Sequence, residues 1–167
     1  MNNKIKTITF TGIFTALAII LAYVEFMIPP LFPSLPGIKM GLPNIIIVFL
    51  LYRKNVTSAI LVSLIRIALV TMLFSNAMAF LYSLAGAVLS LFIMILLRKL
   101  NFLSVVGVSI AGAVAHNIGQ ILMAMLLLDS SELGFYLIAL IFSGIIAGIF
   151  VGLCGALLIK KFPSKFH

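Results

Sequence analysis

The sequence predicts an all-α integral membrane protein, a single bundle of six transmembrane helices that occupies residues 1–167. Composition is the first reason, because 64% of the 167 residues are hydrophobic and only 8% are charged, whereas soluble domains carry roughly a quarter charged residues. The second reason is that the apolar residues fall into six segments. These segments cover residues 8–28, 42–52, 56–74, 77–97, 102–128 and 133–159.

The first two segments differ in kind. Segment 8–28 has about the 20 residues that a helix needs to cross a bilayer, and it lacks the short apolar region of a cleaved signal peptide. The stretch "PPLFPSLPGIKMGLP" follows it and is too rich in proline and glycine for a helix interior. Segment 42–52 is too short to span straight by itself, which predicts a broken or re-entrant helix here.

The other four segments each reach spanning length, and the charges between segments predict their direction. Suppose that the N-terminus lies in the cytoplasm and that successive segments cross the membrane in alternating directions. Of the charged residues between the segments, only Lys39, Asp129 and Glu132 then lie on the outer side. Basic residues in short loops resist translocation, so both termini are expected in the cytoplasm. The net charge of +8 is then a consequence of topology and does not indicate nucleic-acid binding. The cytoplasmic set is Lys4, Lys6, Arg53, Lys54, Arg98, Lys99, Lys160, Lys161 and Lys165.

Small residues recur at four-residue spacing, which places each set on one helix face where backbones can approach closely. The sets are Gly144, Gly148 and Gly152; Ala111, Ala115 and Gly119; Ala79, Ser83 and Ala87; and, in the first segment, Gly12 with Ala16 and Ala18 with Ala22. Packing inside the bundle explains most of them. One stripe on the first helix could instead dock a partner subunit, and the spacing alone leaves both interpretations open.

Arg66 lies near the middle of the third segment, where a cation costs roughly 2.5–3.5 kcal/mol on insertion scales. Burial of this guanidinium requires a carboxylate, a cluster of acceptors or an anionic ligand. Glu25, near the outer end of the first segment, is the best internal counter-ion. If Glu25 instead extends to the membrane interface, an anionic substrate group is the natural partner of Arg66.

The stretch "GAVAHNIGQ" in the fifth segment contains His116, Asn117 and Gln120. Their spacings of three and four residues place all three on one broad helix face, at a depth similar to that of Arg66. Each could also simply bond a neighbouring helix. Lys39, Asn44, Asn76 and Tyr82 are expected to close the same space from above. The prediction is a pocket open to the outside, lined by apolar residues with a few polar anchors.

Several kinds of chemistry have no motif in this chain. There is no G-x-x-x-x-G-K-[ST] for ATP, no H-E-x-x-H or Cys/His cluster for a metal, and no acidic cluster to hold Mg²⁺ on a diphosphate. The single cysteine, Cys154, excludes a disulfide framework. The sequence therefore predicts a binding protein without catalytic residues, cofactor or metal, which depends on a partner for energy.

Four phrases, "IKMGLPNIIIVFLLYRK", "SLIRIALV", "YSLAGAVLSLFIMILLRKL" and "VSIAGAVAHNIGQILMA", resemble the bacterial membrane family named both heptaprenyl diphosphate synthase component I and Gx transporter. The resemblance covers nearly the whole chain. That family is similar to the substrate-binding S-components of energy-coupling-factor (ECF) importers, six-helix proteins with a long first loop over an outward pocket. The likeness implies a bacterial plasma-membrane protein, with a transmembrane coupling subunit and a pair of ATPases docked on small residues of the first helix.

The expected function is that of an S-component-like subunit that binds a small anionic or amphipathic molecule from the outer side. Its expected polar contacts are Lys39, Asn44, Arg66, Tyr82, His116, Asn117 and Gln120. The older family name implies an alternative, a non-catalytic membrane subunit that assists a soluble prenyl synthase in making a heptaprenyl or polyprenyl diphosphate for quinones. A third possibility is a purely structural bundle whose polar residues pair with one another.

Overall fold

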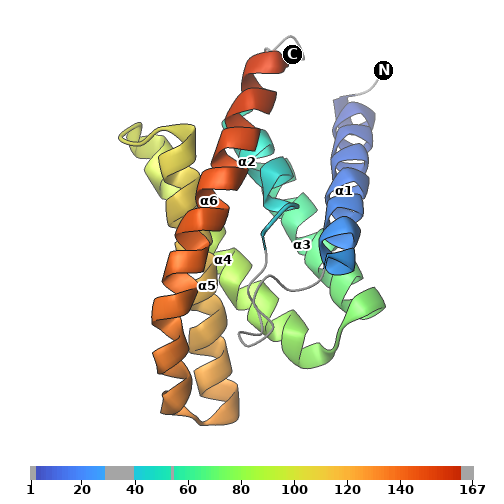
Figure 1. Ribbon diagram of the computed structural model, residues 1–167. Coiled ribbons are helices and arrows are strands. Elements are labelled where there is room, and N and C mark those ends of the chain that lie inside the picture. Colours follow the sequence, from blue (N-terminus) through green and yellow to red (C-terminus); the bar gives the residue numbers. More distant parts are fainter. Residues whose placement is uncertain (1–2, 29–39, 54, 163–167) are drawn as a thin grey trace.

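The computed structural model describes residues 3–28, 40–53 and 55–162, and within them it is all-α (Figure 1). The long helices are α1 (Asn3–Met27), α3 (Val56–Phe74), α4 (Ala77–Leu100), α5 (Val105–Leu128) and α6 (Tyr136–Lys161). The short helix α2 (Asn44–Tyr52) lies between α1 and α3 in the chain, and the 3₁₀ helix η1 (Ser131–Phe135) lies between α5 and α6. Five of the helical stretches in the described part are long and apolar enough to cross a membrane. The described part of the chain therefore has the six predicted α-helices, but only five of them match the prediction of transmembrane length, because α2 is too short to span.

The N- and C-termini lie at the same end of the bundle (Figure 1). α5 packs along α4 on one side and along α6 on the other, while α1 packs mainly on α3. The basic residues at the ends of α2, α4 and α6 lie at the end of the bundle that holds the termini, and Asp129 and Glu132 lie at the opposite end. The bundle is thus polarised by charge along its axis, as the sequence predicts.

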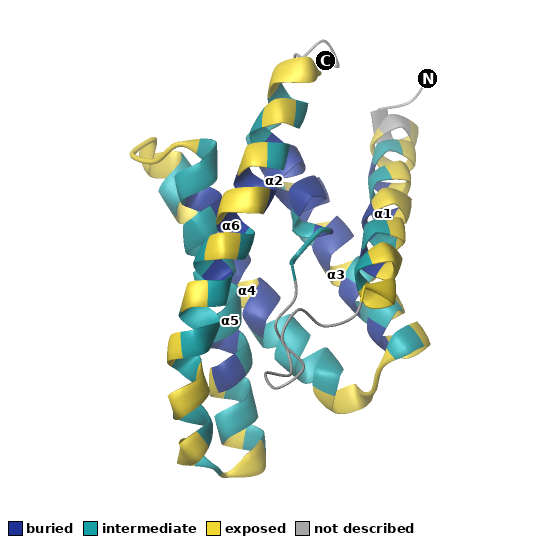
Figure 2. Ribbon diagram, viewed as in Figure 1, coloured by how far each residue is buried: buried dark blue, intermediate teal, exposed yellow. Residues whose placement is uncertain are grey.

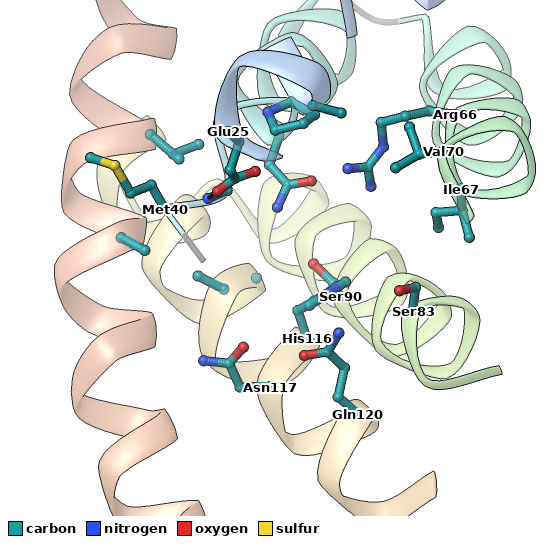
Figure 3. A pocket seen from close by; sticks show the side chains of 18 of the residues that line it. Glu25, Met40, Arg66, Ile67, Val70, Ser83, Ser90, His116, Asn117 and Gln120 are labelled. Carbon is teal, nitrogen blue, oxygen red and sulfur yellow. Dashed lines mark hydrogen bonds between the residues drawn. The ribbon is translucent and has the colours of Figure 1, made fainter. Parts of the chain in front are cut away.

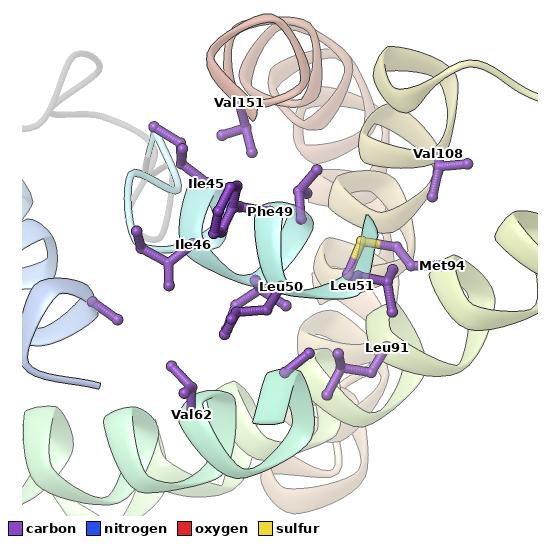
Figure 4. Close-up of a cluster of buried hydrophobic side chains, with 14 residues drawn as sticks. Ile45, Ile46, Phe49, Leu50, Leu51, Val62, Leu91, Met94, Val108 and Val151 are labelled. Atoms are coloured by element: carbon purple, nitrogen blue, oxygen red, sulfur yellow. The ribbon is translucent and has the colours of Figure 1, made fainter. Parts of the chain in front are cut away.

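The core of the bundle is built around α2. Seven of its nine residues are buried, from Ile45 to Leu51, because its sequence is apolar around the whole circumference and such a helix has no face suited to water. α2 contacts α1, α3, α5 and α6, and its side chains mesh with Val62, Leu91 and Val151 (Figure 4). At about 1.5 Å per residue, it is only about 13 Å long.

Glycines set the close approach of α6 to α5. A Cβ added at Gly144, Gly148 or Gly152 would lie 3.0, 2.5 or 2.7 Å from the nearest atom of α5. Real Cβ atoms essentially never come nearer than 3.0 Å. The predicted packing role of this stripe inside the bundle is confirmed.

The ends of the helices carry local signals. The side chains of Asn55, Asn76 and Ser104 accept hydrogen bonds from the backbone N–H groups three residues on, which caps α3, α4 and α5. Asn101 and Asp129 end α4 and α5 in the left-handed conformation, with φ of 50° and 47°, which short polar side chains tolerate.

The outer surface of the bundle is apolar. Exposed residues follow the outward faces of the long helices (Figure 2), and they include Phe92, Phe142 and Ile146 at 62%, 65% and 70% exposure. Large exposed apolar patches of this kind are unsuited to water and suited to lipid. The surface and the helix lengths together are those of a multi-pass membrane protein.

Candidate ligand-binding cavity

A cavity of about 320 Å³ lies inside the bundle, and all six α-helices contribute to its wall. Its volume is at the lower end of the range for ligand pockets. Apolar side chains such as Val48, Ile67, Met94 and Val151 line much of it. The polar lining residues are Glu25, Asn44, Arg66, Thr71, Ser75, Ser83, Ser90, Ser109, His116, Asn117 and Gln120.

Arg66 extends from the middle of α3 into this cavity (Figure 3). Its Nε atom is buried and has no hydrogen-bond partner among the described residues. It is the only Lys or Arg in the described lining. A buried charged donor without an acceptor is unfavourable. The Nε of Arg66 is therefore available to an acceptor on a bound ligand.

Glu25 lies near the end of α1, across from Arg66 (Figure 3). Its Oε1 accepts a hydrogen bond from the backbone N–H of Gly41, which stands just before α2 with φ of +74°. The described residues contain no direct ion pair between Glu25 and Arg66, and the Arg66 Nε has no hydrogen-bond partner there. Glu25 therefore anchors the chain ahead of α2 and faces Arg66 without a direct bond to it.

His116, Asn117 and Gln120 are brought together on the cavity side of α5 (Figure 3). The Asn117 Nδ2 donates to the carbonyl oxygen of Leu140 on α6, at 2.6 Å. Asn117 thus joins two helices as well as lining the cavity. Close packing of α4 supports this face, because a Cβ on Gly86 would lie 2.7 Å from the His116 carbonyl oxygen.

The other predicted contacts fall in different places. Asn44, at the start of α2, lines the cavity, while Lys39 lies outside the described residues. Tyr82 is half-buried on α4 but is not part of the lining, whereas the adjacent Ser83 is. The reason is that neighbouring helix residues point about 100° apart. Asn76 is expected to close the cavity but is not among its lining residues. Its side chain instead accepts the hydrogen bond that caps the start of α4.

The four residues predicted to dock a partner divide into two pairs. Gly12 and Ala16 are exposed on α1, and nothing lies within 4 Å of a Cβ added at Gly12. Ala18 and Ala22 are only 0% and 7% exposed, and Ala22 lines the cavity. Ala18 and Ala22 face the bundle interior, so a partner on the surface of α1 would not reach them.

Sequence reasoning missed a row of hydroxyl groups. Ser90 and Ser109 are buried polar residues that line the cavity beside Met94, and Thr71 lines it from α3. Thr71 is satisfied locally, since its Oγ1 donates to the carbonyl oxygen of Ile67 at 2.7 Å. Ser83 belongs to the stripe of small residues with Ala79 and Ala87, which predicts packing. Its hydroxyl is the one feature of the sequence that could have indicated a place in the cavity wall.

The arrangement is suited to binding. Among the described residues there is no group of three or more His, Cys, Asp or Glu side chains that could hold a metal ion. The site combines one guanidinium, one carboxylate, amides and hydroxyls with an apolar wall. Such a set can hold an anion and orient a polar group.

Comparison with known protein families identifies the family of this chain. The family model described as heptaprenyl diphosphate synthase component I matches residues 14–158. The chain belongs to this family. The matched range includes every described residue that lines the cavity, from Ala22 to Val151. No curated protein and no solved structure matches the chain. The resemblance seen in the sequence is thus confirmed for this component I family, and the fold fits a membrane subunit.

Proposed function

We propose that this component I protein is a membrane-embedded binding subunit for a small anionic or amphipathic molecule, similar in role to the S-component of an ECF importer. The observation that carries the proposal is the Arg66 guanidinium, which faces a cavity with its Nε buried and unpaired among the described residues. A purely structural bundle gives no reason to keep a cation there, because an apolar residue of similar size would avoid the desolvation cost.

The polar residues of the cavity support a ligand over mutual pairing. Glu25 is the available acid, and its carboxylate is bonded to Gly41. Asn117 uses its amide nitrogen on Leu140, which leaves its carbonyl oxygen toward the cavity side. The polar lining is therefore partly committed to structure and partly left for a ligand. Intramembrane ionisable residues in such a setting usually mark substrate pathways.

The proposed orientation follows from charge. Basic residues at the ends of α2, α4 and α6 lie with the two termini, and the positive-inside rule assigns that end to the cytoplasm of a bacterial plasma membrane. The cavity wall continues to Phe74, Ser75 and Ala79 near the opposite end. A ligand would then enter from the outer side.

Transport would require partners. The chain has no phosphate-binding loop for ATP, so a coupling subunit with two ATPases would supply the energy. On α1 the exposed Gly12 and Ala16 offer a surface for close helix contact. Ala18 and Ala22 take no part in this proposal because they are buried.

Substitution of Arg66 tests the binding role. We expect Arg66→Ala to lose the compound that co-purifies with the wild type, by at least tenfold, while the protein still inserts and runs as a single species in size-exclusion chromatography. Arg98→Ala is the matched control, because Arg98 lies over the Tyr52 ring outside the cavity. Equal retention by both variants would remove Arg66 from the binding site.

The family description favours a second candidate, a non-catalytic membrane subunit that assists a soluble prenyl diphosphate synthase. Affinity purification of the tagged chain from its host's membranes, with mass spectrometry of co-purifying proteins, separates the two. Recovery of a coupling subunit and two ATPases supports the importer. Recovery of a soluble prenyl synthase instead supports the second candidate and refutes the first.

A further inference from the structure

The charges on the cavity wall restrict what it can hold. Of the described lining residues, Arg66 is the only Lys or Arg and Glu25 the only acid. Glu25 is fixed by the Gly41 N–H, so its negative charge stays at the wall. Among the described lining residues, a ligand therefore meets one guanidinium, one hydrogen-bonded carboxylate and the His116 imidazole.

Resting on the proposed binding function, we infer that the cavity selects a compact monoanion with a single carboxylate, bound by Arg66, and rejects diphosphates. The guanidinium offers donors in a planar fork that matches a carboxylate. The buried Nε of Arg66 is one of these donors and has no partner among the described residues. One negative charge on the ligand then neutralises the one guanidinium of the described lining.

A diphosphate would not fit this electrostatic environment. It carries at least one more negative charge than Arg66 can neutralise, and the extra charge would face Glu25. Uncompensated charges in a low-dielectric interior are strongly unfavourable. Glu25 is thus a specificity-determining residue, which admits a monoanion and excludes more highly charged compounds.

The volume sets a second limit. At roughly 30 Å³ of liquid per small heavy-atom unit, a cavity of about 320 Å³ holds on the order of ten heavy atoms. A heptaprenyl chain has about thirty-five carbons and would need roughly 1000 Å³ on the same basis. The part of a ligand that this volume can hold is therefore much smaller than a heptaprenyl chain.

The far side of the cavity adds further polar groups. Gln120 and Asn117 on α5, together with Ser90 on α4, offer amide and hydroxyl groups to the space that Arg66 faces (Figure 3). Apolar side chains such as Met94 and Val151 surround them. The matching ligand has a carboxylate at one end, an apolar body and a neutral hydrogen-bonding group.

The test identifies the compound that the protein carries. Wild type, Arg66→Gln, Glu25→Gln and the control Arg98→Gln are purified from the host's membranes in mild detergent, and bound small molecules are released and identified by mass spectrometry. We expect wild type and Arg98→Gln to retain one compact carboxylate of about ten heavy atoms. Arg66→Gln should retain at least tenfold less.

Glu25→Gln tests the exclusion of diphosphates, since the Gln oxygen can still accept the Gly41 N–H while the charge is lost. Added geranyl diphosphate should displace the retained compound from Glu25→Gln at a concentration at least tenfold lower than from wild type. This competition and the identity of the wild-type compound decide the inference even if Arg66→Gln fails to fold.

Two results would overturn different claims. A diphosphate or a long prenyl chain recovered from wild type, or equal displacement from wild type and Glu25→Gln, overturns the monoanion inference and leaves a binding function in place. Absence of any compound enriched in wild type overturns the proposed binding function itself.

Discussion

Gly148 provides a sharp test of how α5 and α6 hold the cavity together. A Cβ at this position would lie 2.5 Å from the Ile110 Cα and 3.1 Å from the Ser109 carbonyl oxygen. These are backbone atoms, so no side-chain rotation relieves the contact. The helices would have to separate by about 0.9 Å to reach the 3.4 Å of ordinary contact, a strain typical of overpacking at about 1–3 kcal/mol.

The alanine also improves helix propensity by up to about 1 kcal/mol, so the expected net loss for Gly148→Ala is about 1–2 kcal/mol. Circular dichroism during titration with SDS measures the unfolding. Gly12→Ala is the matched control, because nothing lies within 4 Å of its added Cβ, and it should be neutral or slightly stabilising. If both variants unfold at the same SDS fraction, the close packing of α5 and α6 is refuted.

Two further substitutions test the core and the helix contact at the site. Leu50→Ala should lose about 2–5 kcal/mol because Leu50 is 0% exposed, while Leu157→Ala, at 67% exposure, should change little; equal effects in SDS titration would contradict a core centred on α2. Asn117→Leu removes the bond to Leu140 and should cost about 0.6 kcal/mol, at most about 1.7. An unchanged SDS midpoint would show that Asn117 does not join the helices.

Most of the fold was predictable because each helix carries local signals. Apolar length predicts the spans, and caps refine them: the fifth segment was expected from residue 102, but α5 begins at Val105, where Ser104 caps it. α1 begins at Asn3 rather than near residue 8, since lysines continue a helix without being apolar. Such signals end at the helix itself and do not say which face meets which neighbour.

The site was predicted less completely for that reason. Spacing on α5 brought His116, Asn117 and Gln120 onto one face, which the cavity lining matches. On α4, however, the sequence predicts Tyr82 as the contact and Ser83 as a packing residue, and only the rotation of the packed helix places Ser83 in the wall. The bond from Asn117 to α6 likewise depends on a neighbour that is 23 residues away in the sequence.

The short α2 explains why a cavity exists at all. A helix of about 13 Å fills less than half of a hydrocarbon core about 30 Å thick, and its buried side chains seal the half near the termini. The cavity lies where this helix begins, because Gly41, Pro43 and Asn44 are part of its wall. The positive end of the α2 dipole therefore faces the same space as Arg66. A full-length second helix would occupy this space, so the cavity that Arg66 faces depends on α2 being short.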